Sequence, residues 1–116
     1  MQQEFLLTRS NYYSQFFNTA IFFDPFRIYF NSAFENLALE IYYNVQNYYR
    51  DKTLPQASFY ILLYPDLGLF EKSFGVSANN VQVAREGSDL VVGVKNPTAH
   101  DAFHSIVAAI DMATAN

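Results

Sequence analysis

Two histidines, His100 and His104, stand four residues apart in a segment with helical spacing. On a helix this spacing places both rings on one face, close enough to share a metal ion. A metal site needs at least one further ligand. Asp111 lies on the same stripe, but seven helical residues at a rise of about 1.5 Å put it roughly 10 Å from His104. We therefore expect no metal and no other cofactor, and His100 and His104 remain the candidates if the protein is a metal-dependent enzyme.

No other group of residues forms a recognisable catalytic arrangement. The chain has no cysteine, which excludes disulfides, thiolate metal sites and a thiol nucleophile. No serine lies in a Gly-x-Ser-x-Gly elbow, and the four glycines form no phosphate-binding loop. Ser105, His104 and Asp101 are too close together on one helix to point at a common centre. The sequence thus predicts a protein that is not an enzyme.

Tyrosines recur as adjacent pairs, and asparagines stand beside them in the second quarter of the chain. Neighbours on a helix project about 100° apart, so one ring of a pair can face the core while the other reaches the rim. Two interpretations stay open. The outer rings either close the edge of a core with their hydroxyls in water, or they anchor a binding surface to which the amides add hydrogen bonds. The second interpretation predicts an interface made of Tyr29, Asn36, Tyr42, Tyr43, Asn47 and Tyr49.

Two N-terminal helices are expected to position these side chains. Ser10 is a suitable N-cap for the first, which Asp24-Pro25 would end. The second and longer helix is predicted over residues 25–50. It carries two apolar stripes where a half-exposed helix needs one, which indicates a helix that is central in its domain or covered by a second subunit. The longer stripe consists of Phe26, Phe30, Phe34, Leu37, Ile41, Val45 and Tyr48.

The second half of the chain carries strand signals and two further helices. Residues 58–64 form a short apolar run typical of a buried strand, and residues 67–74 fit a short helix that ends at Gly75. Residues 81–94 alternate as a hairpin that turns at Gly87. Thr98 and Asp101 resemble a capping box for a last helix over residues 99–113. The predicted fold is a single α+β domain, residues 1–116, with a small antiparallel sheet packed on helices.

Charge and composition restrict the partners. The formal charge is −4 and the seven Lys and Arg residues are spread singly, which argues against nucleic acid because phosphate contacts need clustered cations. Asp24, Pro25 and Arg27 interrupt the apolar stretch over residues 12–30, so a membrane partner is not expected. The N-terminus has no basic region followed by an apolar run and a cleavage site, and we expect a cytoplasmic protein.

The uneven distribution of aromatic residues is the main basis for a functional prediction. Twenty of the twenty-one lie between Phe5 and Phe74. We expect a small acidic accessory protein that self-associates as a homodimer or higher oligomer, or that binds a protein partner as an adaptor or inhibitor. One alternative is a module that binds a small apolar ligand in an aromatic pocket between the first two helices and the strands. Another is a metal-dependent enzyme that uses His100 and His104.

Overall fold

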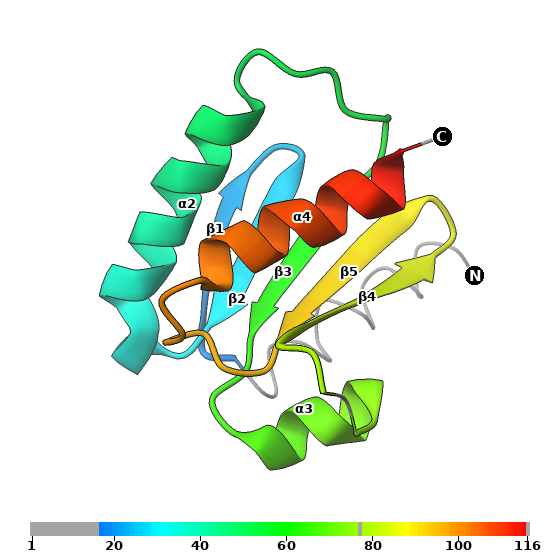
Figure 1. Ribbon diagram of the computed structural model, residues 1–116. Coiled ribbons are helices and arrows are strands. Elements are labelled where there is room, and N and C mark those ends of the chain that lie inside the picture. Colours follow the sequence, from blue (N-terminus) through cyan, green and yellow to red (C-terminus); the bar gives the residue numbers. More distant parts are fainter. Residues whose placement is uncertain (1–16, 77, 116) are drawn as a thin grey trace, which may run out of the picture.

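The computed structural model describes residues 17–76 and 78–115 and builds them around one five-stranded sheet (Figure 1). Its strands are β1 (Thr19–Phe23), β2 (Phe26–Phe30), β3 (Phe59–Leu63), β4 (Val81–Glu86) and β5 (Asp89–Val94). They lie in the order β1-β2-β3-β5-β4. The three central strands run parallel, whereas each edge strand is antiparallel to its neighbour.

Two helices cover one face of the sheet, and a third lies beyond one end of the strands (Figure 1). The covering helices are α2 (Glu35–Tyr49), which follows a 3-10 turn at Ser32–Phe34, and α4 (Ala102–Thr114). The third is α3 (Leu67–Phe74). Parallel neighbours need a crossover connection, and α2 supplies it between β2 and β3. The connection from β3 to β5 contains α3 and β4.

The main core lies between the sheet and the two covering helices. Because side chains alternate along a strand, every second residue of each strand faces the helices. Ile28, Ile61 and Val92 stand in register on the three central strands, and all three are fully buried. All five residues of β3 are buried, as expected for a central parallel strand. The helices contribute Ala38, Ile41, Val45, Ile106, Val107 and Ile110 to this core.

A second, smaller cluster of aromatic residues lies on the opposite face of the sheet. Tyr64 of this cluster contacts Phe70 of α3, with ring centroids 5.5 Å apart. The ring of Phe74 lies directly against Gly93 of β5, where any side chain would collide with it. This glycine therefore lets α3 approach the sheet closely. The other buried members are Phe17, Tyr29, Tyr60, Leu62 and Val91.

The predicted long helix over residues 25–50 is wrong in its first part. Residues 26–30 form β2, and only residues 35–49 are α-helical. The sequence Phe-Arg-Ile-Tyr-Phe is aromatic and β-branched, as strands prefer. Phe26 and Phe30 stand four apart, a spacing that fits one face of a helix and equally one face of a strand. Pairing with β1 and β3 decides between the two.

The predicted first helix is also wrong where the structure describes it. Residues 19–23 form β1, and Asp24-Pro25 is the two-residue connection of a hairpin instead of a boundary between helices. Thr, Ile and two Phe within five residues favour the extended conformation. The rest of that prediction, including Ser10, lies outside the described residues.

Predictions based on local signals are confirmed in the second half of the chain. The strand and the short helix appear as β3 and α3, with the Asp66 carboxylate accepting a hydrogen bond from the Leu69 backbone N–H at 2.9 Å. Gly75, with φ of 80°, follows α3 and donates its N–H to the carbonyl of Glu71. The β4–β5 hairpin turns at Gly87, which has φ of 65°.

Two further corrections concern the last helix and the type of sheet. α4 begins at Ala102, three residues later than predicted, and the Thr98 hydroxyl donates to Asn96 Oδ1 instead of capping the helix. Asp101 stands at the N-cap position without a side-chain capping bond. The sheet is mixed and not antiparallel, because β3 inserts between β2 and β5 and runs parallel to both. The α+β class is confirmed.

Candidate functional site

Within residues 17–76 and 78–115, β1 is an edge strand without the usual protection of an edge. Among the residues that the structure describes, it pairs with β2 alone. Its sequence, Thr-Ala-Ile-Phe-Phe, contains no charged residue and no proline. An edge strand presents alternate backbone N–H and C=O groups to solvent, and natural proteins usually guard them with charges, bulges or a covering segment. The free side of β1 therefore has the chemistry of a docking edge.

Exposed rings flank this edge on both sides. Phe22 is 67% exposed on the sheet face away from the helices, and Tyr43 is 58% exposed on α2. Leu39, one turn before Tyr43 and on the same side of the helix, is 36% exposed. Contacts between rings connect β1 to α2. The ring centroids of Phe23 and Tyr42 lie 4.4 Å apart, and those of Tyr42 and Tyr43 lie 4.9 Å apart. We call Phe22, Phe23, Leu39, Tyr42, Tyr43 and the free side of β1 the β1–α2 rim.

The guanidinium of Arg27 lies beside the exposed ring of Phe22. The two residues are paired across β1 and β2, and the guanidinium carbon lies 6.0 Å from the Phe22 ring centroid. The same carbon lies 5.3 Å from the ring centroid of Tyr60 on β3. A cation over aromatic faces is favourable at these distances. Arg27 thus lies between an exposed ring of the edge strand and a buried ring of the central strand.

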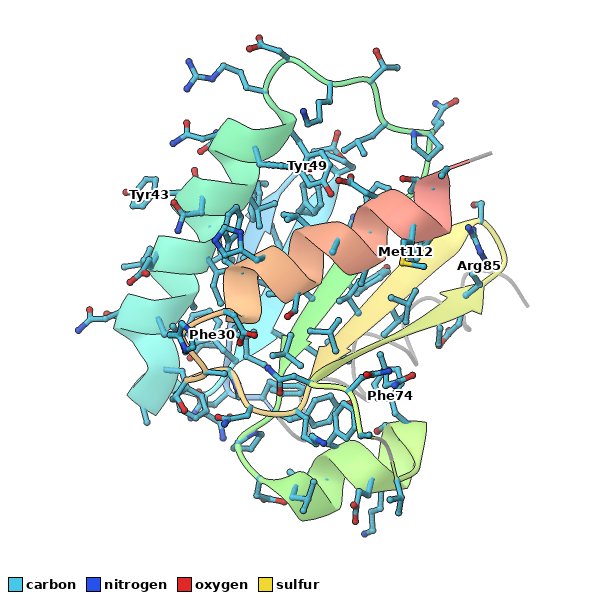
Figure 2. The ribbon with its side chains drawn as sticks, viewed as in Figure 1. Phe30, Tyr43, Tyr49, Phe74, Arg85 and Met112 are labelled. Carbon is cyan, nitrogen blue, oxygen red and sulfur yellow. The ribbon has the colours of Figure 1, made fainter. Side chains whose placement is uncertain are left out.

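The six residues predicted as an interface separate into different environments. Asn36, Tyr43 and Asn47 are exposed on α2, and Tyr42 is half-buried beside Tyr43. Tyr29 is buried on β2, on the sheet face opposite α2. Tyr49 is buried on the side of α2 that faces α4, whereas Tyr43 projects outward (Figure 2). The structure thus joins Tyr42 and Tyr43 in one surface and separates Tyr29 and Tyr49 from it.

Tyr48 and Tyr49 share one acceptor on α4. The hydroxyls donate to the two carboxylate oxygens of Asp111, at 2.5 Å from Tyr48 and 3.0 Å from Tyr49. The hydrogen bond from Tyr48 to the carboxylate is the main cause that raises the pKa of Tyr48. Burial is the first cause that raises the pKa of Tyr49, followed by its hydrogen bond to Asp111. This arrangement fastens α2 to α4 and leaves neither phenol as a ready proton donor near neutral pH.

A cleft of about 860 Å³ lies at the amino ends of the three parallel strands, and we call it the strand-end cleft. Its walls are the β1–β2 connection, the end of α2 with the loop over residues 50–58, and the first residue of β5. Buried Phe26 and Tyr49 line its base. The charged residues that line it are Asp24, Arg50, Lys52 and Asp89. This volume lies within the range of small-molecule sites.

His100 and His104 are not arranged as the helical spacing predicted. His100 lies in the turn before α4 and His104 in the first turn of the helix, so the two rings do not share the helical spacing on which the hypothesis depended. Both residues are exposed. Within residues 17–76 and 78–115, no three His, Cys, Asp or Glu side chains gather in a way that could hold a metal ion.

No family model, curated protein or solved structure matches this chain. None of the helices in the described part of the chain has the length and apolar character needed to cross a bilayer.

Sequence reasoning missed Phe22, Phe23 and Leu39 of the rim and all the charged residues of the cleft. The signal for Phe22 was present, because two aromatic and β-branched runs separated by two turn residues indicate a hairpin. No comparable signal exists for the cleft, whose walls come from three separate segments of the chain.

Proposed function

We propose that this chain is a non-catalytic interaction module that self-associates through the β1–α2 rim. The observation that carries the proposal is the uncharged free edge of β1, flanked by Phe22 and Tyr43, which are both more than half exposed. A sheet edge of this kind is a template for strand addition. Exposed aromatic rings beside it are typical anchors of protein interfaces.

The simplest arrangement adds the β1 strand of a second copy antiparallel to the first. The two five-stranded sheets then join into one continuous sheet. With the two-fold axis at Ile21, Phe22 of one copy stands opposite Ala20 of the other on the same sheet face, so a large side chain fills the space beside a small one. The α2 helices approach each other on the other face, where Tyr43 and Leu39 become covered.

The expected affinity is moderate. Complete burial of an aromatic or leucine side chain contributes about 1.5–3 kcal/mol, and the rim residues are already partly covered. Association also costs on the order of 4–15 kcal/mol in lost rigid-body freedom. Few anchors and a short strand then correspond to a dissociation constant on the order of micromolar. The protein would consequently exchange between monomer and dimer at working concentrations.

Sedimentation velocity over the micromolar to millimolar range tests the proposal. We expect the wild type to shift from monomer to dimer, and Phe22→Ser and Tyr43→Ser to weaken the dimer at least about tenfold, as loss of an interface anchor does. Met112→Ser is the matched control, since Met112 is 81% exposed on α4 and lies away from the rim (Figure 2). A strict monomer at every concentration contradicts the proposal, as does a dimer that all three variants weaken equally.

Small-ligand binding is the second candidate function, and one observation favours it. The strand-end cleft combines an apolar base with charged walls, although it lies at the end of the sheet and not between the first two helices, where an aromatic pocket was predicted. The nature of its ligand is a separate question from self-association.

A further inference from the structure

Backbone hydrogen bonds hold the strand side of the cleft in place. The Phe59 N–H donates to the Pro25 carbonyl at 2.8 Å, and the Leu90 N–H donates to the Ser58 carbonyl at 3.0 Å. The Ser58 N–H donates to Asp89 Oδ1 at 2.9 Å. These bonds connect the β1–β2 turn, the start of β3 and the start of β5 into one row. The cleft therefore has a preformed side, as ligand sites usually do.

The charges of the cleft are segregated by sign. Both acids come from the strand side, Asp24 from the β1–β2 turn and Asp89 from the first residue of β5. Both bases come from the helix side, Arg50 from the end of α2 and Lys52 from the loop that follows. The Asp24 carboxylate makes no hydrogen bond or ion pair with any residue in the described part of the chain and is exposed. It remains available to a ligand.

Arg50 and Lys52 also have N–H groups that can donate to a ligand. Arg50 donates from Nη2 to Asn47 Oδ1 at 2.8 Å, which holds the guanidinium at the helix end and leaves other N–H groups of its planar fork. The Lys52 ammonium lies 4.6 Å from the ring centroid of Tyr48. Asn47 and Tyr48 do not line the cleft, but Arg50 and Lys52 do, so a carboxylate bound there would draw the N–H donors of both side chains to it, those of the guanidinium through two parallel hydrogen bonds.

We propose that the strand-end cleft binds a small zwitterion with an apolar side group, of the class of a free aromatic α-amino acid. Its carboxylate meets Arg50 and Lys52, its ammonium meets Asp24 with Asp89 behind it, and its side group lies on Phe26 and Tyr49. This inference is independent of self-association through the rim.

Electrostatics favours a zwitterion over simpler ligands. An apolar anion would be attracted by Arg50 and Lys52 but would sit beside two carboxylates, and an apolar cation would face the converse problem. A neutral apolar ligand would remove water from four charged groups without replacing their hydrogen bonds. Only a ligand that carries both charges at one end and an apolar group at the other satisfies both walls and the base.

Calorimetric titration with four probes tests this inference on the full chain. We expect phenylalanine to bind at least about tenfold more tightly than 3-phenylpropionate, which lacks the ammonium, and than phenethylamine, which lacks the carboxylate, since charge-assisted hydrogen bonds are the strong ones. Glycine, which lacks the side group, should also bind at least about tenfold more weakly. No binding of phenylalanine at millimolar concentration, or equal binding of phenylalanine and 3-phenylpropionate, would overturn the proposal.

A matched pair of variants assigns the binding to the cleft. Asp24→Asn should weaken the binding of phenylalanine at least about tenfold. The affinity for 3-phenylpropionate should stay unchanged or rise slightly, because the lost carboxylate faces only the ammonium. Glu40→Gln removes an exposed acid of α2 that does not line the cleft, and it should change neither affinity. Equal effects of the two variants would refute the assignment. Unfolding midpoints recorded alongside confirm that both variants remain folded.

Discussion

The two edges of the sheet differ in how they are protected. β4 carries Arg85 and Glu86, and the Arg85 guanidinium donates to the Ala113 carbonyl near the end of α4 (Figure 2). β1 carries no charge, and its exposed Phe22 faces solvent. Charged residues on a strand are a common device against unwanted pairing, and β1 lacks it. The part of the chain that the structure describes thus has a guarded edge at β4 and an open edge at β1, made from strands of similar length.

The difference between the two edges supports the interpretation of the β1 edge as a binding surface. An unguarded apolar edge invites aggregation, so a stable monomer would gain from a charge in β1. The β4 edge shows that the same chain provides such charges elsewhere. We infer that β1 is kept open because a second copy covers it.

The largest expected effect comes from a substitution in the core between α2 and α4. Tyr49→Ser removes a buried ring together with its hydrogen bonds to Asp111 and Val107. We expect the free energy of unfolding to fall by about 3–5 kcal/mol, as for other large-to-small substitutions in a core. Tyr43→Ser, on the rim side of the same helix, should stay within about 0.5 kcal/mol. Urea unfolding of a dilute, monomeric sample measures both, and similar losses would contradict the assignment of the two tyrosines.

A smaller effect is expected from titrating the hydroxyls that connect α2 to α4. Folding raises the pKa of Tyr48 and of Tyr49 above the ordinary value of 10.0. Below pH 10 both states keep these protons and the stabilisation is complete. Above it the unfolded chain loses them first, so stability falls as pH rises. Denaturation midpoints measured between pH 8 and 11 should stay level up to about pH 10 and decrease above it, and the decrease should be less steep in the double variant Tyr48→Phe/Tyr49→Phe. An equally steep decrease in the double variant would contradict this account.

Local signals predicted the second half of the described chain. Asp66 and Gly75 mark both ends of α3, and Gly87 marks the hairpin turn, so the information needed lies within a few residues. The first half lacks comparable capping and turn residues at the boundaries of its strands and helix. Phe26 and Phe30 fit a helix or a strand, and the choice depends on Phe59, which pairs with Phe26 from more than thirty residues away. Such non-local pairing cannot be seen in local periodicity.

The candidate sites were predicted only in part, for the same reason. Tyr42 and Tyr43 were identified because an adjacent pair on a helix must divide between core and rim. Phe22 was missed because it joins these rings only when β1 forms. The cleft was missed entirely, since Asp24, Arg50 and Asp89 come together only through the order of the strands.

Amide hydrogen exchange at rising protein concentration tests the central claim most directly, because it observes both edges in one sample. The claim is that a second copy hydrogen-bonds to the free side of β1. We predict that amides of β1 exchange more slowly as concentration increases, while those of β4 keep a constant rate. Rates in β1 that do not depend on concentration, or equal slowing at both edges, would contradict the claim.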